Sequence, residues 1–490
     1  LIPMGIITKQ SIYNLTSIGF AFMIGAVNML FLYPSFPGKE FQGLIIALLA
    51  NSNLIQPFIS FGVQHTLIKF FSNADSKEQQ DRLLWFSLFF PLLILVLLVP
   101  FYIYFNEEIL SFISNENLLV NKFPFLIISI AISTAYFEIF FSWLRVQLKS
   151  VFGNFLKEVY PRLLTFFLLI LYAFKLIDLE IFIIFLICGY YLRLIVIMMY
   201  SFSIYLPSFN GFIPSSWKTM LRYSSLIFLS GAAASFILDI DKSMIFSLTS
   251  DANVAYYAVA IYVAAIIEAP GRAMFQITSP LVARALNKNE KTTLENLLKK
   301  SSLNLLIVSG FVFLLINLNL IDFYQIINQE GYSSAIGVVI IVSLGKLFSM
   351  SMGCLNNIII NSKKYYYVFW FSVVSAILAV ILNYFMIQSY GIIGAALATL
   401  IVITIVNLSK IILVYFLFKI HPYSAKTVSI LINLIIIYLI VYLVPNLLNP
   451  WLSISLRSFL ILGLFITTII IFKWSDEIET LLKEIRKRLY

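Results

Sequence analysis

Residues 83–105 read LLWFSLFFPLLILVLLVPFYIYF, a stretch without a single charged side chain. A helix of about 20 apolar residues crosses the hydrocarbon core of a bilayer, so this stretch is long enough to span a membrane. A strand of a membrane β-barrel would alternate apolar and polar residues, whereas residues 91–100 and 428–444 show no such alternation. The stretch therefore predicts a membrane-spanning helix.

The composition of the whole chain extends this prediction. Of its 490 residues, 61% are hydrophobic and 11% are charged, and the mean hydropathy is +0.96. Because a water-soluble domain has about a quarter charged residues, this composition excludes a soluble fold and intrinsic disorder. We predict an all-α integral membrane protein with about 14 transmembrane helices. The predicted spans are residues 12–33, 41–63, 83–105, 123–144, 158–175, 180–203, 220–246, 253–275, 301–321, 334–357, 367–388, 391–417, 427–444 and 453–473.

The distribution of Lys and Arg predicts the orientation. With the N-terminus inside, 26 of the 33 Lys and Arg fall in cytoplasmic segments and three fall within spans. The four on the outer side of the membrane are Lys39, Lys122, Lys175 and Arg457. Short cytoplasmic loops are enriched in Lys and Arg, so both termini are expected in the cytoplasm. The same loops account for the net charge of +10 without a nucleic-acid partner.

The chain contains no pattern typical of a metal or cofactor site. Its only cysteines, Cys188 and Cys354, lie in apolar segments, and its two histidines, His65 and His421, are far apart in the sequence. These residues form neither a disulfide framework nor a metal-ligand spacing, so no cofactor is predicted.

Two loops with similar charge patterns suggest an internal repeat. The loop after the second span carries Lys69 and ends at Arg82, and the loop after the eighth carries Arg284 and ends at Lys300. Six spans separate them, so the two halves would have parallel topology, as in transporters built from repeats. The predicted parts are two six-helix lobes around a central cleft, 1–210 and 211–420, two additional transmembrane helices, 421–473, and a cytoplasmic amphipathic tail helix, 474–490.

Polar side chains within the spans are the candidate functional residues. A charge at the centre of a membrane helix costs about 2.5–3.5 kcal/mol, so each one needs a cleft, a partner or the headgroup region. The candidates for substrate binding or gating are Glu138, Arg145, Asp239, Asp241, Lys242, Glu268, Arg272, Lys346, Asn51, Asn53 and Gln56.

The densest group of charges is the sequence Asp239-Ile240-Asp241-Lys242 in the seventh span. Asp239 and Lys242 are three positions apart, so they share a helix face and can form an ion pair. The cluster would gate the cleft or titrate, or it would form a structural ion pair at a helix end.

Two further spans carry an acid and a base on one face. Glu138 and Arg145 form a stripe in the fourth span, although Arg145 has the alternative role of a cytoplasmic anchor. Glu268 and Arg272 flank Pro270, which removes a helical hydrogen bond, so a kink is expected there. A bent helix with these charges suits a moving gate, or the bend is only architectural.

Lys346 is the most suggestive single residue, because its own span contains no acidic neighbour. Its alternatives are snorkelling and pairing with Glu138 or Glu268. Arg193, in the sixth span, is expected to snorkel to the cytoplasmic interface.

Three amides of the second span, Asn51, Asn53 and Gln56, have two readings. Amides in apolar helices often hydrogen-bond a neighbouring helix. They also donate and accept, as contact with a hydroxyl-rich sugar requires.

Two stretches carry a resemblance to a known family. Residues 241–257, which include the run SLTSDANVAYY, and residues 391–399, GIIGAALAT, resemble bacterial polysaccharide repeat-unit flippases of the multidrug/oligosaccharidyl-lipid/polysaccharide exporter superfamily. The resemblance implies a flippase that moves undecaprenyl-pyrophosphate-linked oligosaccharide from the inner to the outer leaflet of the bacterial cytoplasmic membrane. Its implied partners are the lipid-linked oligosaccharide and membrane lipids. Further partners that the resemblance leaves open are a proton or sodium ion for coupling and a polysaccharide polymerase with chain-length proteins.

Departures from the relatives leave other functions open. Lipid II flippases carry arginines in the first two spans and drug exporters an acid in the first, and this chain has neither. A cation-coupled drug exporter is one alternative. A membrane polysaccharide polymerase is another, although such an enzyme would need a large outer loop with catalytic carboxylates or arginines. The longest outer loop here, residues 106–122, contains glutamates and no arginine.

Overall fold

A computed structural model describes most of the chain. The described residues are 4–71, 76–105, 125–147, 149–209, 211, 213–214, 216–327, 331–364, 366–445 and 447–474. The predicted tail helix beyond residue 474 and the predicted outer loop at 106–122 lie outside them.

The secondary structure within these ranges is helical, without a β-strand, as predicted. Among the described residues, eleven helices are long and apolar enough to cross a membrane, or twelve when the bent α12 (Trp217–Leu248) counts as one span. Each predicted span lies on one observed helix or on two or three consecutive helical segments. The fold class is therefore confirmed, and the total of fourteen spans stays a prediction.

The chain divides into two compact units, Leu1–Ala255 and Tyr256–Tyr490. The helix that we assigned to the start of the second lobe, α12, belongs to the first unit. The helices of the first unit are α1 (Met4–Val27), η1 (Asn28–Leu32, a π-helical turn), α2 (Tyr33–Ser35), α3 (Lys39–Ser60), α4 (Val63–Phe71), α5 (Lys77–Tyr104), α8 (Leu126–Val146), α9 (Ser150–Glu158), α10 (Tyr160–Ala173), α11 (Leu179–Ile204) and α12.

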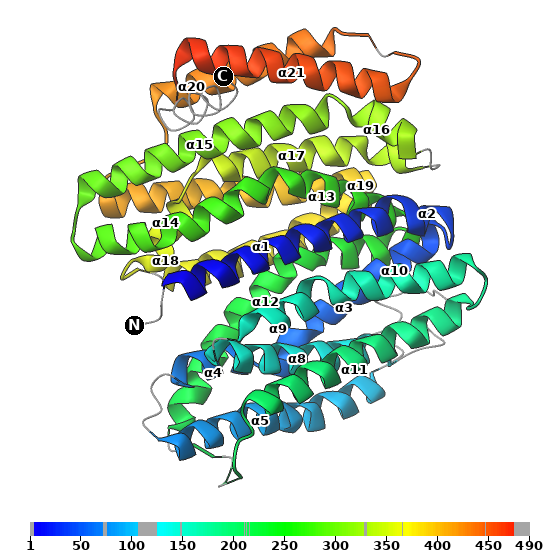
Figure 1. Cartoon of the computed structure of the whole chain (residues 1–490), viewed down its shortest axis with the longest axis vertical. Helices are drawn as coiled ribbons and strands as arrows, with labels where there is room; N and C mark the ends of the chain where they lie inside the picture. The colour runs from blue at the N-terminus through cyan, green and yellow to red at the C-terminus, as the bar shows by residue number, and fades with distance from the viewer. Residues whose placement is uncertain are drawn as a thin grey trace. The chain divides into compact units, whose positions relative to one another are not determined.

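Within the first unit, α3 packs on α8 and α12, and α8 packs on α11 (Figure 1). Phe137, Leu144, Leu156 and Ile197 form one buried cluster that joins α8, α9 and α11. Helix starts follow local sequence: Ser76 caps α5 by accepting a hydrogen bond from the backbone of Gln79.

The second unit is built around α15. Its helices, after α13 (Asp251–Ala264) which crosses the boundary between the units, are η2 (Ala265–Glu268, a 3-10 turn), α14 (Ala269–Asn287), α15 (Lys291–Asn317), α16 (Leu320–Ile327), η3 (Tyr332–Ala335), α17 (Ile336–Ser351), α18 (Leu355–Asn361), α19 (Tyr366–Phe418), α20 (Ala425–Tyr442) and α21 (Pro450–Phe472). The two C-terminal helices α20 and α21 lie beside α15 (Figure 1), where Leu306, Leu434 and Ile461 share a buried cluster.

A buried ion pair joins α16 to α21. The Arg457 guanidinium lies 2.8 Å from the Asp322 carboxylate, which also accepts a hydrogen bond from Ser453 at 2.9 Å. Arg457 donates as well to the carbonyls of Leu318 and Val444, so its charge is balanced inside the protein. We counted Arg457 with the outer loops; the structure places it within α21 with its side chain buried, and its side of the membrane stays a prediction.

The 53-residue α19 consists of two helices that meet at Gly391, whose φ of 56° and ψ of −135° are not helical. A Cβ placed on Gly394 would lie 1.9 Å from the carbonyl oxygen of Met386. Eight residues of straight helix would separate these positions by about 12 Å, so the chain turns sharply back at this point. Glycine at both positions allows the tight turn between the predicted spans 367–388 and 391–417.

We predict that Gly394→Ala lowers the melting temperature of the purified protein, because the added methyl group meets backbone that cannot move away. Overpacking of this kind costs about 1–3 kcal/mol. Gly463→Ala in α21 is the matched control, since nothing lies within 4 Å of the added Cβ. Thermal unfolding in detergent measures both variants, and an unchanged melting temperature for Gly394→Ala would contradict the tight turn.

Candidate functional site

The predicted functional residues fall into two groups, one in each unit. Asn51, Asn53, Gln56, Glu138, Arg145, Asp239, Asp241 and Lys242 lie in the first unit, and Glu268, Arg272 and Lys346 lie in the second. Each group is described separately.

A ladder of polar contacts joins α3 to α12. The Asn53 side chain donates to the Asp239 carboxylate at 3.1 Å, and Lys242 forms an ion pair with the same carboxylate. One helical turn further, the Ser243 hydroxyl donates to the side-chain oxygen Oδ1 of Asn51 at 2.6 Å. The predicted pair on α12 is therefore present, and both amides bond the neighbouring helix.

Helix α3 also lies close to the start of α13, the helix that follows α12. A Cβ on Gly43 would lie 1.7 Å from the carbonyl oxygen of Asp251, so only glycine permits this approach. Further along α12, the hydroxyls of Thr66 and Ser224 are 2.6 Å apart. Polar groups and small residues thus hold α12 against α3 and α4 along most of its length, as is usual where membrane helices pack closely.

The second polar group of the first unit centres on Glu138. Its carboxylate pairs with Lys157 at 2.7 Å, and not with Arg145, which is exposed at the end of α8. Lys157 lies on α9, a segment that we treated as a loop. Apolar residues recur there at 151, 152, 155 and 156, a spacing that indicates a short helix and would have predicted it.

Arg193 is the clearest correction among the charged residues of the spans. We expected it to snorkel to the interface, but it is only 4% exposed. Its guanidinium lies 4.2 Å from the ring centroid of Phe137 and 4.7 Å from that of Tyr190. Cation–π contact stabilises a desolvated guanidinium, so the two rings, and not the membrane interface, stabilise the charge of Arg193.

In the second unit, Lys346 of α17 and Glu268 of η2 form an ion pair with 2.9 Å between ammonium and carboxylate. The pairing with Glu268, one of the alternatives for this lysine, is therefore the one observed. The two side chains keep 21% and 28% of their surface exposed, so the pair is half-buried.

Glu268 lies where its helix breaks. The predicted span 253–275 consists of α13, the 3-10 turn η2 and α14, with Pro270 in the first turn of α14. The helix thus changes to 3-10 geometry just before this proline, and the expected kink stays a prediction. A Cβ on Gly271 would lie 2.5 Å from the Met350 sulfur, so the glycine lets α14 approach α17 near the ion pair.

Three other candidates have different surroundings. Gln56 donates to Ser60 on its own helix at 3.2 Å, Arg272 is exposed, and Asp241 is buried at 7% exposure. Sequence reasoning missed two amides of the second unit that join neighbouring helices. Asn407 donates to Ser349 at 3.0 Å, and Asn357 donates to Thr278 at 2.9 Å. Their position inside apolar runs was the available signal.

Comparison with known proteins identifies the family. Residues 7–269, more than half of the chain, match the family described as polysaccharide biosynthesis protein. The chain belongs to this family, which confirms the resemblance seen in the sequence. No curated protein matches the chain.

Solved structures of flippases and transporters share the fold. A lipid II flippase MurJ in an inward closed conformation is 16% identical, covers 95% of this chain and 99% of its own, and gives a TM-score of 0.74. An inward-facing MATE multidrug transporter of the MOP superfamily is 12% identical, covers 83% of this chain and 99% of its own, and gives a TM-score of 0.60. A MATE transporter of Vibrio cholerae is 14% identical, covers 84% of this chain and 96% of its own, and gives a TM-score of 0.56. At these identities the likeness shows the fold alone.

We predict that Asp239→Asn destabilises the protein more than Asn53→Ala does. The first variant leaves Lys242 without its counter-ion at a half-buried position, a loss of about 2 kcal/mol, whereas the second removes one hydrogen bond of about 1 kcal/mol. Adding Lys242→Met to Asp239→Asn should restore most of the lost melting temperature. A double variant less stable than Asp239→Asn alone would exclude the charge-balance explanation.

A double-mutant cycle tests the Lys346–Glu268 pair. Lys346→Met and Glu268→Gln should each lower the free energy of unfolding, with a coupling energy of about 1 kcal/mol between them, as for polar contacts in membrane helices. Arg272→Gln, an exposed charge on the adjacent helix, is the control and should change stability little. A coupling energy near zero would show that the two groups do not interact in solution.

Proposed function

We propose that the protein is a flippase. It translocates undecaprenyl-pyrophosphate-linked oligosaccharide from the inner to the outer leaflet of the bacterial cytoplasmic membrane by alternating access. The family match over residues 7–269 carries the proposal, and the fold shared with a lipid II flippase supports it. The bias of Lys and Arg supports cytoplasmic termini.

The chemistry of the spans is suited to this substrate. A pyrophosphate bearing sugars is anionic and hydrated, so its passage through hydrocarbon is prohibitive without polar groups along the way. Lys346, half-buried and paired with Glu268, offers a cation inside a span. We propose that the pyrophosphate displaces Glu268 from Lys346 during transport, and that amides such as Asn407 contact the sugars.

The carboxylates of the ion pairs are candidates for ion coupling. Release of Glu268 from Lys346, or of Asp239 from Lys242, would leave a carboxylate free to bind a proton or a sodium ion. We propose that one of them couples transport to an ion gradient.

Deletion of the gene in the source organism tests the function. Lipid-linked repeat units should accumulate on the inner leaflet, where added glycan-modifying enzymes cannot reach them in intact cells. Unpolymerised units on the outer leaflet would indicate a polymerase instead. Unchanged glycans together with new sensitivity to cationic drugs would indicate a drug exporter.

Complementation of the deletion strain tests the role of Lys346. Lys346→Ala should abolish glycan export at normal protein level. The swapped variant Lys346→Glu with Glu268→Lys keeps the ion pair but moves the ammonium to the other helix. We expect the swapped variant to recover the stability of the wild type but not glycan export. Full export by the swapped variant would mean that the pair is structural only.

A further inference from the structure

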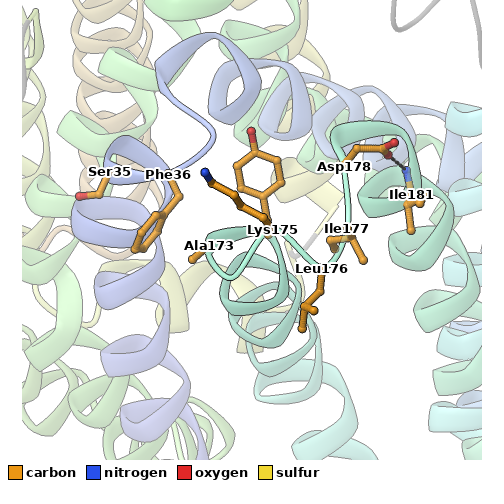
Figure 2. Close-up of a pocket in the computed structure, with 9 residues that line it drawn as sticks. Ser35, Phe36, Ala173, Lys175, Leu176, Ile177, Asp178 and Ile181 are labelled. Carbon is orange, nitrogen blue, oxygen red and sulfur yellow. Dashed lines mark hydrogen bonds between the residues drawn. The ribbon is translucent and has the colours of Figure 1, made fainter.

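An open cavity of about 620 Å³ lies in the first unit, and none of the candidate site residues lines it. It lies between the end of α2 and the turn that connects α10 to α11, and Figure 2 shows its lining. Both connections lie on the side that the Lys and Arg distribution assigns to the outside. Its volume is in the range of sites for small molecules and headgroups.

The lining combines one cation with two aromatic rings and two oxygen-bearing side chains. Lys175 reaches toward Phe36 across the opening (Figure 2), and Tyr172, Ser35 and Asp178 also line the cavity. The Asp178 carboxylate is held in place because it caps α11, accepting a hydrogen bond from the Ile181 backbone at 2.8 Å. An ammonium group binds phosphate, and hydroxyl and carboxylate oxygens bind sugar hydroxyls.

The backbone at Lys175 points to a role for this side chain. α10 ends in a Schellman motif, in which the Leu176 amide donates to the Leu171 carbonyl and the Lys175 amide donates to the Tyr172 carbonyl. Lys175 occupies the left-handed position of the motif, with a φ of 58°. Glycine is the usual residue there because a side chain strains this conformation. Strained backbone conformations cluster at ligand-binding sites, so the position of Lys175 at the edge of the cavity directs attention to its side chain.

We propose that this cavity binds a glycosyl phosphate headgroup on the outer side of the membrane. Lys175 contacts the phosphate, and the rings of Tyr172 and Phe36 pack against the apolar face of the sugar. The assignment of the ligand rests on the proposed function, since the headgroup of a translocated lipid-linked glycan carries both groups. A phospholipid headgroup shares the phosphate but lacks the sugar ring.

The test uses the full-length protein in nanodiscs of zwitterionic lipid, with glucose 1-phosphate as the probe and calorimetry as the readout. Glucose 1-phosphate should bind at least tenfold more tightly than glucose or inorganic phosphate. Lys175→Gly should weaken this binding about tenfold, the loss typical of one charge-assisted hydrogen bond. The same variant should raise the melting temperature because glycine relieves the strain.

Lys419→Gly is the matched control. Lys419 ends α19 in the second unit, is exposed and has a φ of 56°, so this substitution removes the same charge and relieves the same strain outside the cavity. It should leave the affinity for glucose 1-phosphate unchanged. Equal affinities of the wild type and Lys175→Gly would overturn the proposal.

Two further outcomes bear on the source of the ligand. Inorganic phosphate binding as tightly as glucose 1-phosphate would exclude sugar recognition. Complete loss of probe binding in nanodiscs containing phosphatidylglycerol would assign the cavity to phospholipid headgroups; either result overturns the proposal. Because binding is measured without transport, failure of the export test leaves this result standing. A failed binding test likewise leaves the export test standing.

Discussion

The structure depends on the cost of placing polar groups in hydrocarbon. Each charge within a span must be compensated, and in most cases the partner lies on another element. Lys346 reaches Glu268, Glu138 reaches Lys157 and Arg457 reaches Asp322. The hydrocarbon of the bilayer therefore requires these contacts, and the contacts in turn join helices that are distant in the sequence.

The ion pairs differ in burial, and the difference separates structural from functional candidates. The Arg457–Asp322 pair keeps 8% and 0% of its side-chain surface exposed and is surrounded by further hydrogen bonds, so it stabilises the packing of α21. The Lys346–Glu268 pair retains more surface and lies at a helix break. A charge that must meet an anionic headgroup needs such access, and a purely structural charge does not.

Positions that favour glycine are informative in two ways, by having a glycine or by having another residue in its place. At Gly43 and Gly394 it allows backbone to approach backbone, where any side chain would collide. At Lys175 the chain has a lysine where glycine would relieve the strain. The first case explains why helices pack closely, and the second directs attention to a side chain at a cavity.

The sequence by itself determined the membrane class and the position of the helices, because long apolar runs admit only helices in a bilayer. Its short motifs also indicated the family. It also determined that Asp239 and Lys242 share a face, since helical spacing is local. Only the tertiary structure decided that Asn53 bonds Asp239 of this pair and that Lys346 pairs with Glu268. The stacking of Arg193 on Phe137 and Tyr190 also became known only from the structure. Such partners lie tens to hundreds of residues away along the chain, and helical periodicity carries no information about which faces of distant helices meet.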